Sequence, residues 1–322
     1  MIPPAAAAAF LAANGWGAAD ILPVAGDASF RRYFRAVDGA RTAILMDAPP
    51  PQEDPRPFIQ MAQWLTANGF AAPEIHGVDL AHGLVLLQDF GDVRMRETVD
   101  AEPAREGALY GAAIDILVAL HAREAAPLAP YDRAVLHREA NLLTEYYCPA
   151  LGIVADQAAY AAAWDAVFDH ALAGPAVTVL RDFHAENLML IGADTLGLLD
   201  FQDALAGHPA YDLVSLLQDA RRDVGEDVEA AMLARYKAAT QTDAGFDAAY
   251  HVLGAQRNAK IVGIFTRLWK RDGKLRYPTL CPRVWRYLDR DLAKPALAPV
   301  KAWFDATIPP ELRGDPLALS AC

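Results

Sequence analysis

Cysteine and long apolar runs are what this chain most clearly lacks. Among its 322 residues only Cys148, Cys281 and Cys322 carry thiols, and their spacing fits neither a disulfide framework nor a cysteine zinc site. No stretch approaches the roughly 20 uncharged apolar residues that a membrane span requires. The first residues have no basic region before an apolar run, so we expect no signal peptide. These absences predict a protein of the reducing cytoplasm with no membrane partner.

Basic residues are also scarce. The chain has 29 Lys and Arg against 41 Asp and Glu, which gives a formal net charge of −12 at pH 7. A field of that sign repels a phosphate backbone, so we expect no nucleic-acid partner. A composition of 54% hydrophobic and 22% charged residues is typical of globular proteins and excludes general disorder. A chain of this length forms one large domain or two smaller ones.

The first ninety residues have the pattern of a small antiparallel sheet. Residues 29–37 alternate, with Arg31, Tyr33 and Arg35 on one face and Phe34 on the other. A turn at Asp38-Gly39 then leads into a returning strand. The further strands expected are 42–47, 74–79 and 84–88, and the helices expected are 5–14 and 58–69.

Long patterns rich in Ala and Leu dominate from about residue 93, with one β segment at 177–200. We therefore predict an α+β fold, with a small sheet-containing part over 1–90 and a large, mostly helical part over 91–322. The helices expected in the second part are 104–123, 136–147, 156–173, 211–222, 226–240, 246–269 and 282–306.

The β segment brings together residues that carry chemistry. A short apolar strand ends at Asp182, and a hairpin symmetric about Ala193 and Asp194 would place Asn187 opposite Asp200. Carboxylate and amide oxygens are ligands that Mg²⁺ accepts, which leaves Asp182 as a base.

These residues also carry a family resemblance. Asp182-x-x-x-x-Asn187 followed by Asp200 resembles the catalytic loop and metal aspartate of the protein-kinase-like fold. The runs RDFHAENL and LLDFQDA are similar, more specifically, to the aminoglycoside phosphotransferase family of small-molecule kinases. The resemblance implies a two-lobed fold, use of ATP and Mg²⁺, Asp182 as catalytic base, and Asn187 and Asp200 as metal ligands.

Three flanking segments resemble one branch of that family, the bacterial anomeric amino-sugar kinases. They are GDASFRRYFR, MDAPPPQEDPRPF and IFTRLWKRDGK. The resemblance implies transfer of the γ-phosphate of ATP to the anomeric (C1) hydroxyl of N-acetylmuramate or N-acetylglucosamine, in the recycling of cell-wall peptidoglycan.

Other functions remain open at this point. Within the kinase class, the acceptor could be an aminoglycoside, choline, homoserine or another hexosamine. A nucleotide-binding pseudokinase that docks a partner is a second alternative. A third is a metallohydrolase built on Asp182, His184, Asp200 and His208, although the spacing of these residues fits it poorly.

The nucleotide side departs from the family pattern. Ser29 and Phe30 occupy the place of the phosphate-covering loop, although an ordinary turn explains that segment equally well. The strand that usually carries a phosphate-anchoring lysine has Met46 there and no lysine. We hypothesise that Arg31 or Arg35 supplies the missing charge; the alternative is two solvated surface arginines.

The run Asp89-Phe90-Gly91 spells a motif that usually marks the metal aspartate, but it precedes the Asp182 loop. We interpret it as the hinge between the lobes, where backbone groups of Gln88, Asp89 and Phe90 would bind adenine.

Candidate acceptor contacts are weaker. An acceptor with a carboxylate calls for a cation, and Lys260 and Arg267 lie on one side of a helical pattern, although a solvated basic face would look the same. Glu139 and Tyr146 are seven residues apart and could bind sugar hydroxyls. His184 would contact the sugar or order the catalytic loop.

Overall fold

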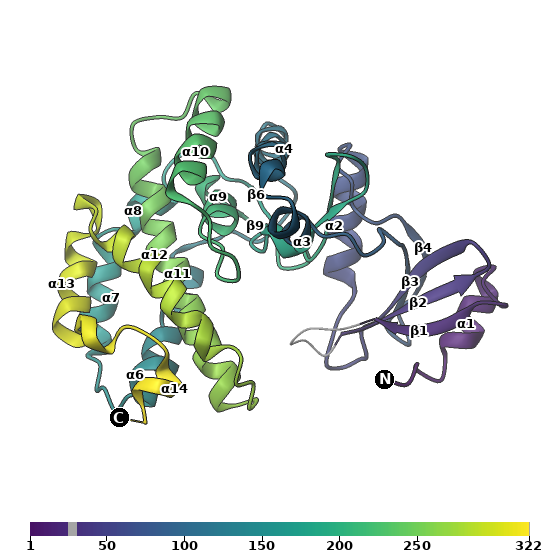
Figure 1. The fold of residues 1–322 in the computed structure, drawn as a ribbon, viewed down its shortest axis with the longest axis horizontal. Helices are drawn as coiled ribbons and strands as arrows, with labels where there is room; N and C mark the ends of the chain where they lie inside the picture. Colours follow the sequence, from purple (N-terminus) through teal and green to yellow (C-terminus); the bar gives the residue numbers. More distant parts are fainter. Residues whose placement is uncertain (25–30, 322) are drawn as a thin grey trace. The chain divides into compact units, whose positions relative to one another are not determined.

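The computed structural model describes residues 1–24 and 31–321, which form two compact units (Figure 1). Unit 1 comprises Met1–Ala113 and Ala185–Ala204, and unit 2 comprises Ile114–His184 and Leu205–Cys322. The segments 91–113 and 185–204 therefore belong to the same unit as the N-terminal sheet.

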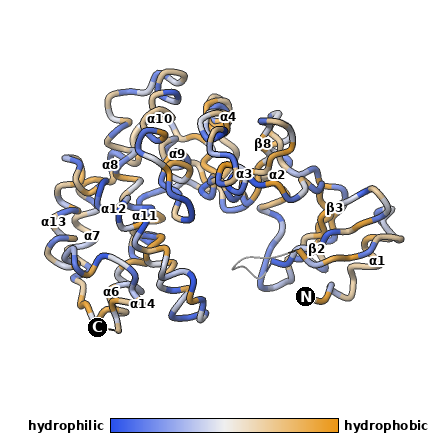
Figure 2. Tube along the Cα trace, in the orientation of Figure 1, coloured by the Kyte–Doolittle hydropathy of each residue, from blue (hydrophilic) through white to orange (hydrophobic). Residues whose placement is uncertain are grey.

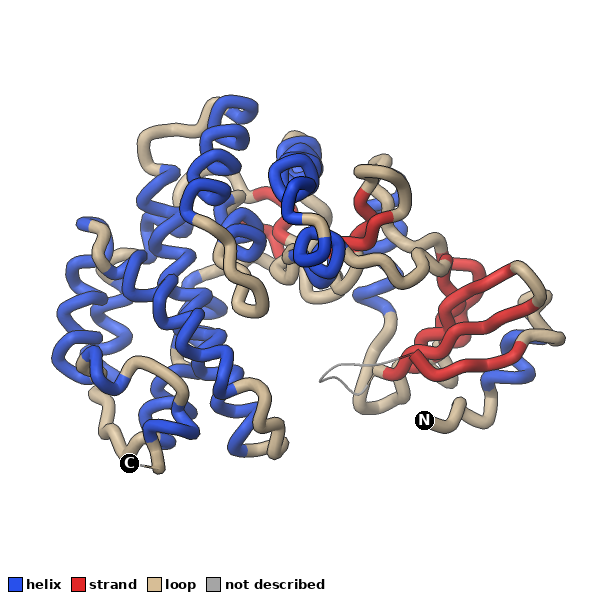
Figure 3. The backbone as a smooth tube through the Cα atoms, viewed as in Figure 1, coloured by secondary structure: helices blue, strands red, loops and turns tan. Residues whose placement is uncertain are grey.

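Unit 1 is built on a five-stranded antiparallel sheet of order β1-β2-β3-β5-β4 (Figure 3). The four strands predicted from the sequence are confirmed, with ends that differ by at most three residues. The edge strand β1 was not foreseen, because its sequence DILPV is short and contains a proline, which is tolerated only at a sheet edge. The strands are β1 Asp20–Val24, β2 Arg32–Asp38, β3 Arg41–Asp47, β4 Ile75–Asp79 and β5 Leu84–Gln88.

Helix α1 (Ala7–Ala13) covers one face of this sheet. Phe10 and Leu11 of the helix belong to one buried cluster with Phe34 and Leu45 of the sheet. In Figure 2 this helix lies on the apolar side of the colour scale. Because side chains alternate along a strand, Tyr33 and the residues two before and two after it lie on the opposite face.

The rest of unit 1 carries the hairpin that the sequence places next to the catalytic loop. Strand β7 (Leu188–Leu190) pairs with β8 (Leu196–Leu198). The hairpin is held to the helical part of the unit by Phe58, whose ring stacks on Phe201 at a centroid distance of 5.0 Å. The other α-helices of this unit are α2 Arg56–Ala67, α3 Met95–Ala101 and the first half of α4 Glu106–His121.

Unit 2 is organised around the long helix α11 (Phe246–Lys270), which contacts α5, α8, α9 and α12. Two short strands of this unit, β6 (Val177–Val179) and β9 (Leu205–Gly207), pair with each other. The other helices are α5 Arg133–Ala140, α6 Cys148–Ala150, α7 Gln157–Asp165, α8 Phe168–Leu172, α9 Ala210–Leu217, α10 Glu226–Thr240, α12 Cys281–Leu292, α13 Ala298–Thr307 and α14 Pro316–Leu319.

Helix α10 occupies the predicted range, whereas three predicted helices are interrupted. The range 282–306 is divided into α12 and α13 by a short turn at Pro295–Leu297, since proline cannot continue a helix. The range 136–147 contains α5 and a π-helical turn, Leu143–Tyr147, and 156–173 contains α7 and α8. Within residues 1–24 and 31–321, no helix combines the length and apolar character that a bilayer crossing needs.

Candidate active site

The β7–β8 hairpin brings Asn187 and Asp200 together. Leu188 pairs with Leu198, so Asn187 faces Leu199, whose backbone N–H donates to the Asn187 carbonyl at 3.0 Å. The predicted pairing of Asn187 with Asp200 was therefore wrong by one residue. Asp200 has a left-handed backbone (φ 59°), and its Oδ2 accepts from Asn187 Nδ2 at 3.3 Å. The two side chains thus meet despite the shifted register.

The donor set of this pair suits Mg²⁺. Asp200 is exposed, and its Oδ1 accepts a hydrogen bond from Gln202 Nε2 at 2.8 Å. Carboxylate and amide oxygens keep lone pairs beyond one hydrogen bond each. Mg²⁺ is usually held by one or two carboxylates together with phosphate oxygens and water. The part of the chain that the structure describes holds no group of three or more His, Cys, Asp or Glu arranged for a metal.

Arg31 and Tyr33 stand near this pair, on the sheet face opposite α1. Arg31 Nε lies 3.5 Å from Glu53 Oε2, and the two side chains are 13% and 20% exposed. Burial raises the pKa of Tyr33, the positive charge of Arg31 opposes that shift, and the negative charge of Asp200 adds to it. Tyr33 is therefore within electrostatic range of both Arg31 and Asp200.

Arg35, the other arginine predicted as a substitute for the lysine, is occupied elsewhere. Its Nε lies 2.7 Å from Asp89 Oδ2, and its Nη2 lies 2.8 Å from Asp92 Oδ1. Hydrogen bonds to Asp92 and Asp89 raise the pKa of Arg35 above its ordinary value. Arg35 therefore fastens the segment after β5, whereas Arg31 is paired with Glu53 and acts electrostatically on Tyr33.

The segment predicted as a hinge follows β5 directly. The backbone N–H of Gln88 donates to the Glu74 carbonyl at 2.8 Å. The Asp89 carboxylate accepts from the backbone N–H of Gly91 at 2.9 Å in addition to its contact with Arg35. A Cβ on Gly197 would come within 2.6 Å of the Phe90 ring, so the ring packs directly on strand β8. Ser29 and Phe30, predicted for the phosphate-covering loop, lie outside the described residues.

In unit 2, side chains of helix α9 hydrogen-bond to the backbone next to Asp182. Arg181 has a left-handed backbone (φ 72°). Asp212 accepts from the backbone N–H groups of Leu180 at 2.7 Å and Arg181 at 2.8 Å. Ser215 Oγ donates to the Arg181 carbonyl at 3.0 Å. Together these bonds fix a conformation that side-chain-bearing residues rarely adopt.

Asp182 is partly buried among cations. Burial alone raises its pKa, but the charges of Lys260, His184 and Arg257, with a smaller contribution from Arg181, bring the pKa below the ordinary value. The carboxylate therefore stays ionised at neutral pH and is able to accept a proton.

Arg257 and Lys260 were not predicted to act on Asp182. Arg257 is 4% exposed and its Nη2 donates to Ser215 Oγ at 2.8 Å. Lys260 Nζ lies 3.0 Å from Glu139 Oε1 and 3.3 Å from Tyr211 Oη. The sequence contains a signal for this role, because Arg257 and Lys260 are two cations three residues apart within one long, largely apolar helix.

Glu139 and His184, both predicted as possible sugar contacts, are buried. Glu139 is 6% exposed and His184 is 3% exposed. Burial raises the pKa of Glu139, but Lys260 and Arg181 bring it below the ordinary value. Burial lowers the pKa of His184, whose Nε2 lies 3.3 Å from Arg221 Nη1. The Glu139 carboxylate accepts from Arg181, Tyr131, Lys260 and Gln256. These surroundings favour bracing of the loop over contact with an acceptor.

Tyr146 and Arg267, the two remaining acceptor candidates, lie together. Both are half-buried, and the guanidinium carbon of Arg267 is 5.9 Å from the centroid of the Tyr146 ring. That distance is within the range of a cation–π interaction.

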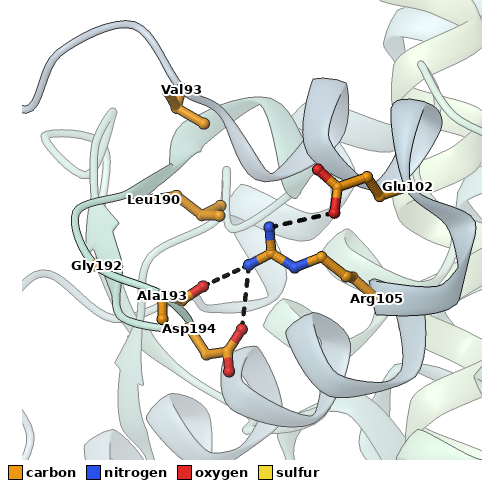
Figure 4. A pocket seen from close by; sticks show the side chains of 7 residues that line it. All are labelled: Val93, Glu102, Arg105, Leu190, Gly192, Ala193 and Asp194. Carbon is orange, nitrogen blue, oxygen red and sulfur yellow. Dashed lines mark hydrogen bonds and ion pairs between the residues drawn. The ribbon is translucent and has the colours of Figure 1, made fainter.

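A depression of about 570 Å³ lies in unit 1 around the turn between β7 and β8 (Figure 4). Arg105 lines it and donates to the Ala193 carbonyl and to Asp194 at 3.2 Å. Glu102 lies 3.9 Å from the same guanidinium. Because the Arg105 guanidinium already has protein partners, we interpret its role in this depression as stabilising the turn between β7 and β8.

An antiparallel sheet, a largely helical second unit and the residues Asp182, Asn187 and Asp200 are the features for which the sequence predicts a small-molecule phosphotransferase. The model of the phosphotransferase enzyme family matches residues 20–251, and the chain belongs to this family. The N-acetylmuramate/N-acetylglucosamine kinase of Caulobacter vibrioides is 40% identical over 96% of this chain and 98% of its own. The enzyme of the same name from Pseudomonas aeruginosa is 40% identical over 89% of each chain.

Solved structures establish the fold. The ADP-bound aminoglycoside phosphotransferase APH(2'')-Ib superposes with a TM-score of 0.58 at 13% identity, over 84% of this chain and 92% of its own. Choline kinase LicA from Streptococcus pneumoniae gives a TM-score of 0.61 at 12% identity, over 87% and 93%. The predicted α+β, protein-kinase-like fold is confirmed.

Proposed function

We propose that this phosphotransferase transfers the γ-phosphate of ATP to the anomeric hydroxyl of N-acetylmuramate and N-acetylglucosamine. The observation that carries the proposal is the 40% identity to a kinase of that name over nearly the whole of both chains. The sugar 1-phosphate would return cell-wall sugars to biosynthesis. The reaction would take place in the cytoplasm, a location consistent with the free thiols of Cys148 and Cys281.

Asp182 would be the catalytic base. The acceptor hydroxyl gives its proton to the Asp182 carboxylate while its oxygen bonds to the γ-phosphorus of ATP. The bond from that phosphorus to the bridging oxygen breaks, and ADP leaves. The cations around Asp182 support this role because they keep the carboxylate ionised before the proton arrives.

Asn187 and Asp200 would hold Mg²⁺, which when bound neutralises charge on the phosphate oxygens. Arg31 would take the place of the absent lysine and contact a nucleotide phosphate. This assignment is supported by its electrostatic proximity to Tyr33 and, through Tyr33, to Asp200. Backbone groups of Gln88, Asp89 and Phe90 would bind adenine, and Ser29 and Phe30 would cover the phosphates.

The test is a phosphorus-NMR and mass-spectrometric assay of the purified protein with MgATP and each sugar. Kanamycin and choline serve as alternative acceptors. A sugar 1-phosphate that is lost with Asp182→Asn supports the proposal. Transfer only to kanamycin or choline would overturn the choice of acceptor, and ATP binding without transfer to any acceptor would favour the pseudokinase alternative.

A further inference from the structure

We propose that Arg267 and Tyr146 form a subsite for the carboxylate of an acidic amino sugar. The subsite would determine how well a sugar with an ether-linked acid is used relative to the neutral sugar. The inference rests on the proposed amino-sugar kinase function and concerns specificity within it.

Two side-chain pairs, which we call the first and second rungs, link α11 to the segment 139–146. The proposed subsite is the second rung. In the first rung, Lys260 Nζ lies 3.0 Å from Glu139 Oε1. In the second, the Arg267 guanidinium lies 5.9 Å from the Tyr146 ring centroid. Lys260 and Arg267 are seven residues apart, which is two helical turns, so both point to the same side of α11 about 10 Å from each other.

The two rungs differ in charge. The cation of the first rung is neutralised by the buried Glu139 carboxylate. The cation of the second rung faces a neutral phenol, and Arg267 Nε is buried with no hydrogen-bond partner among the described residues. Hydrogen bonds of 2.7 and 3.0 Å from Arg271 lower the pKa of Asp272, and the charge of Arg267 adds a smaller contribution.

The chemistry of the second rung suits a carboxylate. A guanidinium offers two parallel N–H donors that match a carboxylate, and an aromatic face beneath it fixes its plane. Both side chains are half-buried, which strengthens a charged contact while leaving it accessible. Figure 2 shows the following turn as hydrophilic, and its charge is mostly positive in a chain of net charge −12. Its cations are Lys270, Arg271, Lys274 and Arg276.

The second rung lies on the same side of α11 as Lys260, and the charge of Lys260 lowers the pKa of Asp182. Side chains on a helix lean toward its N-terminus, so Arg267 leans toward Lys260. An acceptor whose reacting hydroxyl is at Asp182 would therefore direct a substituent on the far side of its ring toward Arg267.

The experiment compares Arg267→Met with the wild type on N-acetylmuramate and N-acetylglucosamine, with ATP saturating. We expect kcat/KM for N-acetylmuramate to fall by about 10- to 100-fold, the range for a lost charge-assisted pair. For N-acetylglucosamine, and for the KM of ATP, we expect a change of less than about twofold. Arg267→Lys should recover part of the loss, since it restores the charge without the planar fork.

Arg276→Met is the matched control, because it removes an exposed guanidinium that stacks on Tyr277 in the segment after α11 and keeps the pair of Arg271 with Asp272 intact. It should leave both sugars unaffected. Equal losses for both sugars with Arg267→Met, or a rise in the KM of ATP, would overturn the subsite and leave the proposed function standing. Turnover of neither sugar by the wild type would overturn the proposed function, and the subsite with it.

Discussion

The two groups of proposed catalytic residues differ in how the protein holds them. In unit 1, Asp200 is exposed, and the neutral amides of Asn187 and Gln202 hydrogen-bond to it. In unit 2, Asp182 is partly buried and surrounded by cations, and the residue before it is fixed by two further side chains. Asp212, one of these two, is completely buried.

The difference follows from what each group must do. Residues that hold a metal ion and phosphates are completed by those charges when they bind, so the protein can leave them accessible. A base must be oriented and ionised before the acceptor arrives, so the protein itself supplies the surrounding charge and hydrogen bonds. Substitutions in the two groups should therefore impair activity through different measurable quantities.

The largest effect should come from Asp182→Asn, which removes the base and leaves the shape of the loop. We expect kcat to fall by about 10²- to 10⁴-fold, the usual contribution of a positioned base. ATP binding, followed by a fluorescent nucleotide analogue, should stay within about twofold. Steady-state rates near those of the wild type would contradict the assignment of the base.

Asp200→Asn should instead change the metal requirement. We expect the Mg²⁺ concentration for half-maximal activity to rise by at least about tenfold. Substitution of residues that only hydrogen-bond to a metal ligand already weakens metal affinity by this factor. The measurement is a Mg²⁺ titration at saturating ATP, with Gln202→Ala as the control for the neighbouring hydrogen bond. An unchanged Mg²⁺ requirement would remove Asp200 from the metal site.

Arg31→Met and Arg35→Met sharpen the comparison within unit 1. For Arg31→Met we expect the KM of ATP to rise by about 10- to 100-fold, since a charged contact with phosphate is lost. For Arg35→Met we expect mainly a lower melting temperature, because the Asp89 side chain, which is 4% exposed, would lose its cationic partner. The melting temperature should fall by about 2–4 °C for each kcal/mol of lost unfolding free energy. The reverse pattern would assign the missing lysine's role to Arg35.

The smallest effect concerns the pH dependence of stability in unit 2. Burial raises the pKa of Asp212 to about 7, from an ordinary value of 3.8. Between about pH 4 and 7 the folded protein holds a proton that the unfolded chain releases, so the free energy of unfolding falls as pH rises through that window. Asp212→Asn should remove this contribution, at most about 1.4 kcal/mol per pH unit.

Urea unfolding at pH 5, 6, 7 and 8 tests this, with the difference between variant and wild type as the observable. The stability of Asp212→Asn relative to the wild type should rise with pH. Parallel curves for the two proteins would show that the Asp212 carboxyl does not titrate in this range.

Local patterns were sufficient to predict much of the fold. The alternation around Tyr33 predicted a strand, and the turn at Asp38-Gly39 predicted its antiparallel pairing with the returning strand, which the structure shows. The predicted range of α10 is the observed one, because it begins at a charged turn and ends before residues that stop a helix. The single helix predicted over 282–306 was wrong, since the apolar pattern continues through Pro295 while the backbone does not.

The sequence could not show that Arg31 and Arg35 have different partners. The two share one strand face, and their difference depends on Glu53 and Asp89, which lie far along the chain. Likewise, the turn length in the β7–β8 hairpin set a register one residue away from the symmetric one. Only the left-handed backbone of Asp200 restored its contact with Asn187.

That backbone conformation, shared by Arg181, has a consequence for attempts to make the protein more heat-resistant. A left-handed residue with a side chain costs about 1–2 kcal/mol relative to glycine. Asp200→Gly should relieve this cost while removing a side chain of the candidate active site, whereas Arg181→Gly would also remove the ion pair with the buried Glu139. A selection for thermal tolerance alone would therefore favour a replacement at Asp200, which the proposed activity requires, and libraries built for that purpose should keep this residue unchanged.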